Sequence, residues 1–184
     1  MAIGFRLRDN FVKLSFSFKR QNYLKYIFCI LKLFSMGVDE KTLKEIVEEA
    51  VPFFKHIGLR LKGVDRNSVT LSLPPAEFLK NHIGTYYAAC IFTVAEACGG
   101  AIFALKADPM KYMIILKGFN INFLKPVTDE ITCTLRVTDE EMGKVLSIVD
   151  EKGKYDWTLP LEVKDAEGRT VASATGIYHI RKLW

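Results

Sequence analysis

The sequence has few residues that could bind a metal ion or form a disulfide, and their spacing suits neither role. It contains no CxxC pair and no HxxxH pair, the spacings typical of zinc, redox and metalloprotease sites. We therefore expect no metal or other cofactor, and we expect reduced cysteines in a cytoplasmic protein. The residues concerned are Cys29, Cys90, Cys98, Cys133, His56, His82 and His179.

Several catalytic and nucleotide-binding motifs are also absent. The sequence has no Gly-x-Ser-x-Gly nucleophile elbow, no phosphate-binding loop and no dinucleotide fingerprint. A serine hydrolase or a nucleotide-binding protein therefore has no support from motifs.

Most of the chain lacks an excess of basic charge. The net charge is +5, but residues 1 to 36 hold seven basic residues and one acidic residue, so the remainder carries about −1. A basic face is the electrostatic requirement for nucleic-acid binding. We therefore expect the folded part not to bind nucleic acid.

Residues 1–35 form a basic, apolar and aromatic N-terminal extension. Lys25 and Lys32 bracket only six uncharged residues and no Ala-x-Ala cleavage pattern follows, which disfavours secretion. Two interpretations stay open. The extension is a surface-bound amphipathic helix with its lysines near anionic lipid headgroups, or it is a leader or loosely attached segment that precedes a natural start at Met36.

The remainder, residues 36–184, has the size of one globular domain, with 49% hydrophobic residues in the whole chain. Apolar residues at three- and four-residue spacing predict a helix that begins at Asp39 and ends near Pro52 or Gly58. Alternation of apolar and polar residues then predicts a strand or hairpin over residues 58–73.

A buried helix follows, starting near Gly84 or Thr85, and most of the chain after Pro109 alternates as strands do. One short helix, over residues 139–152, interrupts these strands and ends at Gly153. The order predicts an α+β fold in which an antiparallel sheet curls around one long helix.

Glu96 is the residue in this buried helix that needs an explanation. It is the only Asp, Glu, Lys or Arg between Asn81 and Leu105, a segment long and apolar enough to span a bilayer. A charge at mid-membrane costs about 2.5–3.5 kcal/mol, and the flanks have the pattern of soluble β-strands, so a core helix is the better interpretation. Burial raises a carboxyl pKa, which suits an acid or base that works near neutral pH. A structural carboxylate, bonded to backbone or to a tyrosine of a partner, is the alternative.

The sequence around this helix resembles the hotdog fold of acyl-CoA thioesterases, over roughly residues 39–182. The phenylacetyl-CoA thioesterase type has Asn-x-x-Gly-x-x-His-Gly-Gly before its catalytic helix position. Here Asn81 and Gly84 match, Tyr87 stands in place of His, and Ala88-Ala89 stand in place of Gly-Gly. Ile121-Asn-Phe-Leu-Lys-Pro126 is similar to the strand motif of the family, and the helix at 139–152 is similar to that of an uncharacterised branch.

The resemblance implies a site made by two subunits. It places Glu96 on the catalytic carboxylate position, as general base or as nucleophile. Residues Ala88 and Glu96 are eight positions apart, about 12 Å along a helix, so one chain cannot bring both to the same thioester carbonyl. A symmetric homodimer, or a dimer of dimers forming a homotetramer, follows. The other residues implied are Asn81 and Tyr87 for catalysis, the Ala88 amide for the oxyanion, and Gly84, Thr85 and Lys125 for substrate binding.

We therefore predict a thioester hydrolase that acts on acyl-CoA or a related acyl thioester. The alternative is a hotdog protein that binds an acyl ligand without catalysis, which the departures at Tyr87 and Ala88-Ala89 favour. Several of these residues also have a purely structural interpretation: Asn81 as a helix cap, His82 as a loop residue, and Lys125 and Arg136 as solvated charges at strand edges. The acyl chain itself cannot be predicted from the sequence.

Overall fold

The computed structural model describes residues 38–183 of this chain. The N-terminal extension, with both interpretations of it, therefore lies outside the described residues. The described part begins with three short helical segments: α2 (Glu40–Glu45), the π-helical η1 (Ile46–Ala50) and α3 (Pro52–Ile57). As predicted, Asp39 caps the first of them, since its side chain accepts a hydrogen bond of 2.8 Å from the Thr42 amide. Pro52 does not end the helical region but begins α3, which ends at Gly58 in the left-handed conformation.

Six strands form one antiparallel sheet in the order β1-β2-β4-β5-β6-β3. The hairpin predicted over residues 58–73 is present as the first two strands. Among residues 38–183, the two edges of the sheet are β1 and β3, and each pairs with one strand only. The strands are β1 (Arg60–Asp65), β2 (Ser68–Leu73), β3 (Tyr112–Phe123), β4 (Ile131–Arg136), β5 (Lys154–Lys164) and β6 (Thr170–Lys182).

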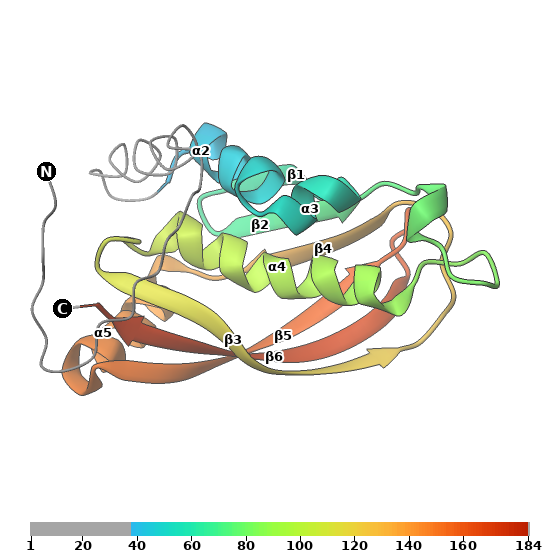
Figure 1. Ribbon diagram of the computed structural model, residues 1–184. Coiled ribbons are helices and arrows are strands. Elements are labelled where there is room, and N and C mark those ends of the chain that lie inside the picture. The colour runs from blue at the N-terminus through green and yellow to red at the C-terminus, as the bar shows by residue number, and fades with distance from the viewer. Residues whose placement is uncertain (1–37, 184) are drawn as a thin grey trace, which may run out of the picture.

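The sheet curls around the 19-residue helix α4 (Ala88–Lys106), while α2 and α3 lie along the other side of that helix (Figure 1). This is the predicted hotdog arrangement. Alternate residues of the strands β2 to β6 face α4, and fully buried apolar side chains from both layers fill the space between them, among them Val69, Leu71, Val94, Ile102 and Ile180. By length and composition α4 also suits a membrane span, but here the sheet covers it as the core helix of the domain.

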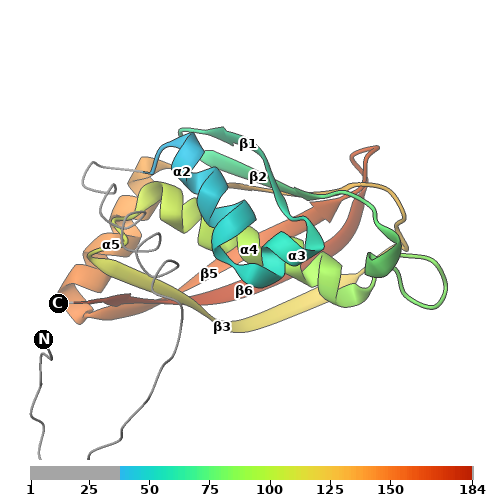
Figure 2. The ribbon, with the colours of Figure 1, turned by 45° about the horizontal axis from the view of Figure 1, so that its top comes forward.

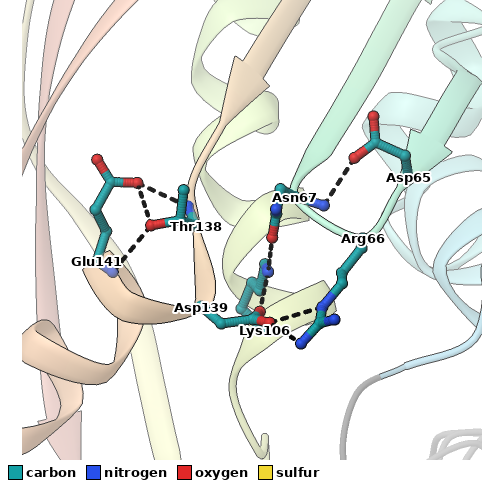
Figure 3. A network of polar contacts seen from close by, with 7 residues as sticks. All are labelled: Asp65, Arg66, Asn67, Lys106, Thr138, Asp139 and Glu141. Atoms are coloured by element: carbon teal, nitrogen blue, oxygen red, sulfur yellow. Dashed lines mark hydrogen bonds and ion pairs between the residues drawn. The ribbon is translucent and has the colours of Figure 1, made fainter.

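Helix α5 (Asp139–Lys152) covers the end of the sheet where α4 terminates, opposite the loop that precedes α4 (Figure 2). Thr138 and Glu141 form a capping box at its start, and Gly153 ends it with a φ of 76°. Figure 3 shows how the start of α5 is attached: Asp139 binds both Lys106 of α4 and Arg66 of the β1–β2 turn.

The other end of α5 is attached by Asp150. This carboxylate accepts hydrogen bonds from Lys111 (3.1 Å) and the Tyr112 hydroxyl (2.9 Å), and Lys182 lies 3.1 Å away. These contacts lower the pKa of Asp150 to about 2. The additional helix is therefore fixed to α4, β3 and β6 at the end of the molecule away from the start of α4.

Candidate active site

Glu96 lies on the face of α4 that the other residues between 38 and 183 cover least. Between Cys90 and Phe103 every residue is buried except Phe92, Glu96 and Gly100, which recur every four positions and so share one face of the helix. Phe92 packs edge-on against Phe119 of β3, with ring centroids 4.8 Å apart. We call Phe92, Glu96 and Gly100 the open stripe, and this contact places it beside the edge strand.

The carboxyl of Glu96 is partly buried and has no partner. Within residues 38–183 its side chain makes no hydrogen bond and no ion pair. Burial raises the pKa of the Glu96 carboxyl, because the charged form loses hydration and no nearby positive charge replaces it. A carboxyl whose pKa is raised by burial and which has no structural partner is a candidate for a catalytic acid, base or nucleophile.

The predicted start of α4 was three to four residues too early. The helix begins at Ala88 with Tyr87 as N-cap, and the segment from Asn81 to Tyr86 is a loop. Asn81 is therefore not the helix cap. Its side-chain oxygen accepts hydrogen bonds from the amides of Ile83 (3.0 Å) and Thr85 (3.2 Å), which folds the loop back on itself.

Thr85 and Gly84, which the sequence also predicted for the site, contribute to the same loop. The side-chain nitrogen of Asn81, Nδ2, donates hydrogen bonds to the Thr85 hydroxyl at 2.8 Å and to the Tyr86 carbonyl at 3.3 Å. Gly84 has a φ of 82°, the left-handed region in which a glycine costs little. Asn81, Gly84 and Thr85 thus shape the backbone that leads into α4.

The start of α4 is exposed and lacks a side-chain cap. Tyr87 is 57% exposed, and Ala88 and Ala89 are exposed as well. The first amides of a helix have no acceptor within the helix, and the Tyr87 side chain does not supply a partner for them. Donors for a developing negative charge are therefore present here, with the positive end of the helix dipole.

Lys125 lies at the same end of the molecule as this loop. It belongs to the exposed segment after β3, which the Tyr86 amide joins through a hydrogen bond of 2.9 Å to the Val127 carbonyl. Arg136 lies elsewhere, because it pairs with Asp65 at the turn between β1 and β2 at 3.8 Å. The structure therefore brings Lys125, but not Arg136, towards the start of α4.

Glu96 and the start of α4 remain separate within one chain. The helix is continuous from Ala88 through Glu96, so about 12 Å of helix divides the helix-start amide from the carboxyl. We call the carboxyl of Glu96 and the start of α4 the two half-sites of the predicted shared site.

Sequence reasoning missed Tyr178 on β6. Its side chain is buried, and its hydroxyl donates a hydrogen bond of 2.8 Å to the backbone carbonyl of Glu96. The only signal in the sequence was a hydroxyl-bearing residue at a core-facing position of a strand. No metal-binding group of His, Cys, Asp and Glu occurs among residues 38–183, and Cys90, Cys98 and Cys133 are free and buried.

Comparison with known proteins places residues 39–180 in the family described as "Domain of unknown function (DUF4442)". A solved structure from Pseudomonas aeruginosa, of a protein of unknown function called a "Probable Thioesterase", is similar with a TM-score of 0.75 and 30% identity. The match covers 80% of this chain and 98% of that one.

Two further proteins give weaker likenesses. The "Putative esterase SSO2140" of Saccharolobus solfataricus is 26% identical over 76% of this chain and 91% of its own length. The PaaI protein from the phenylacetic acid degradation operon of E. coli is 14% identical, with a TM-score of 0.56, over 74% of this chain and 87% of that one. At that identity the last match shows the fold alone, the hotdog fold predicted from the sequence.

Proposed function

The chain belongs to the family described as "Domain of unknown function (DUF4442)", and from that premise and its hotdog fold we propose that it is a thioester hydrolase. The substrate class is acyl-CoA or a related acyl thioester. Relatives whose names carry the words esterase and thioesterase support hydrolysis at the level of the family. The observation that carries the proposal is the partly buried carboxyl of Glu96, which has no partner among the described residues.

Glu96 acts on the thioester carbonyl in one of two ways. As general base it removes a proton from water, which attacks the carbonyl carbon and releases the thiol. As nucleophile its own oxygen attacks the carbonyl carbon and the C–S bond breaks, which releases the thiolate, to be protonated to the thiol, and leaves an acyl anhydride; water then hydrolyses the anhydride to the free acid and restores Glu96. In both cases the carbonyl oxygen becomes an oxyanion, and the amide of Ala88 at the exposed start of α4 is suited to bind it.

The proposal requires two subunits for each site. A symmetric dimer lets Glu96 of one chain meet Tyr87 and the Ala88 amide of the partner subunit. The edge strand β3 supports such an assembly, because it is 12 residues long, pairs on one side only and exposes apolar side chains such as Ile115. An uncovered edge of this length favours pairing with another strand.

A non-catalytic acyl-binding protein is the second candidate. Tyr87 and Ala88-Ala89 favour it, because an alanine side chain limits how closely a thioester approaches the helix backbone. The two candidates differ in one measurable result. A binding protein melts at a higher temperature with acyl-CoA but releases no thiol.

Thiol release from short, medium, long and aromatic acyl-CoAs tests the proposal. We expect turnover by the wild type, and a loss of at least about 100-fold in Glu96→Gln, because the amide is nearly isosteric but cannot accept the proton or attack. Glu45→Gln is the matched control, since it makes the same change at an exposed position of α2 and should keep full activity. Full activity in folded, dimeric Glu96→Gln would exclude the role of Glu96, and a silent wild type would favour the binding protein.

A further inference from the structure

Tyr178 crosses from the sheet to the helix at the level of Glu96. It lies on β6, between Leu116 of β3 and Trp157 of β5, and its side chain is only 1% exposed. Its hydroxyl donates a hydrogen bond of 2.8 Å to the Glu96 carbonyl. Since a carbonyl inside a helix also faces the amide four residues later, the tyrosine adds a second donor at this one position of α4.

Two glycines make the space that the Tyr178 ring occupies. A Cβ atom at Gly99 of α4 would lie 2.2 Å from Cζ and 2.3 Å from the hydroxyl oxygen of Tyr178. A Cβ atom at Gly176 of β6 would lie 2.7 Å from Cε2 of the same ring. Gly100, the next residue of α4, has nothing within 4 Å of such an atom. The close approach of helix and sheet at this level therefore depends on Gly99, Gly176 and the ring between them.

The hydroxyl of Tyr178 remains a donor under all ordinary conditions. Burial raises its pKa, and the neighbouring charge of Glu96 raises it further. The other titratable groups that affect it are the thiols of Cys98 and Cys133, which are buried as well. The contact with the Cys133 thiol and then burial raise the pKa of Cys98, so this group too stays neutral.

The position of the Glu96 carboxyl depends on the backbone that carries it. The carboxyl has no hydrogen-bond partner of its own within residues 38–183, so no side chain of the chain orients it. The hydrogen bond from Tyr178 fixes the backbone of Glu96 from the side of the sheet, and the buried ring of Tyr178 packs against the next turn of α4 at Gly99.

We propose that Tyr178 is a positioning residue, which fixes the distance between the backbone of Glu96 and the sheet and so fixes where the Glu96 carboxyl lies. The inference rests on the proposed thioester hydrolysis for its effect on rate. Its structural part, the control of Glu96 by Tyr178, can be measured without any substrate.

The test compares Tyr178→Phe with Tyr112→Phe. Each change removes one hydroxyl from a buried ring and one hydrogen bond, of 2.8 Å and 2.9 Å, but Tyr112 bonds Asp150 of α5. In Tyr178→Phe we expect kcat for acyl-CoA to fall about 10- to 100-fold with KM within about twofold, because misplacement of a catalytic group costs rate more than binding. Tyr112→Phe should match the wild type in both constants.

Titration of the Glu96 carboxyl by carbon-13 NMR gives the second measurement. The midpoint should shift in Tyr178→Phe relative to the wild type, because the carboxyl changes its surroundings once the hydrogen bond that holds its backbone is lost, and it should stay unchanged in Tyr112→Phe. Equal kcat or equal midpoints in the two variants would overturn the inference. If the wild type releases no thiol from any acyl-CoA, the proposed function fails, and the titration alone decides whether Tyr178 positions Glu96.

Discussion

At the scale of single residues, the burial of Glu96 has a cost in stability. Its pKa is raised in the folded protein, so folding favours the neutral carboxyl over the charged one. The cost is therefore full above the raised pKa and disappears as the pH falls to the ordinary range of a glutamate. An active-site group that reduces stability is a common compromise between activity and folding.

We expect Glu96→Gln to melt a few degrees above the wild type at pH 8, because the variant places no charge in this environment. The gap should close as the pH is lowered towards 4. Thermal unfolding of both proteins across this range measures it, and Glu45→Gln, at an exposed site, should show no such gap. A variant that is less stable than the wild type at pH 8 would mean that Glu96 has a structural partner.

The residues of the site differ in how far the sequence could predict them. Glu96 could be identified because one charge in a long apolar segment is visible without a structure. Tyr178 could not, since a tyrosine at a core-facing strand position is ordinary. The close packing of Tyr178 against α4 depends on Gly99, which precedes it by 79 residues in the sequence and contacts it only in the folded protein.

At the scale of elements, the two neighbouring glycines of α4 make different demands on the helix. Alanine is the better helix former by about 1 kcal/mol, so Gly→Ala inside a helix stabilises where there is room. Gly100 has that room, whereas Gly99 lies against the ring of Tyr178. Substitution of each in turn therefore separates helix propensity from packing.

We expect Gly100→Ala to raise the unfolding free energy by up to about 1 kcal/mol, and Gly99→Ala to lower it by about 1–3 kcal/mol through overpacking. Urea unfolding of the two variants measures both effects. Equal gains in both would show that the contact between α4 and Tyr178 is looser than the structure has it.

Local sequence signals predicted most elements. The capping residue before α5 and the glycine after it determined the bounds of that helix, because both act within a few residues. The start of α4 was placed too early, since Asn81 has a residue type that suits a cap but bonds the amides of its own loop instead. Of the two residues expected to end the first helical region, Gly58 does so. Pro52 instead begins α3, because proline is also favoured at the first position of a new helix.

At the scale of the whole molecule, the order of the strands in the sheet could not be predicted from local signals in the sequence. The strand β3 precedes β4 in sequence but lies at the opposite side of the sheet, next to β6, the last strand. This pairing leaves the edge of β3 uncovered beside the open stripe of α4. Among the described residues, the same pairing thus places Glu96 and the unpaired edge of β3 on one side of the molecule.

Two variants that each damage a different half-site test whether the site is shared. Ala88→Pro removes the amide proposed for the oxyanion, and proline is well tolerated at this first position of α4 because Tyr87 before it has an extended backbone, with a ψ of 136°. Glu96→Gln removes the carboxyl. We expect each variant alone to lose about 100-fold or more in kcat while it stays folded and dimeric.

Mixed dimers of the two variants should recover activity. A dimer of one chain of each kind combines Glu96 of one with the intact helix start of the other, so one of its two sites is complete. Random assembly after co-expression or joint refolding then gives about a quarter of the wild-type activity, since half of the dimers are mixed and half of their sites are intact. If mixed dimers form but stay inactive, the two groups do not act together across the dimer. They also cannot act together within one chain, because about 12 Å of continuous helix separates them, too far for one thioester carbonyl. That result would therefore reject the shared oxyanion site, and with it the role of Ala88, while the loss in Glu96→Gln would still stand.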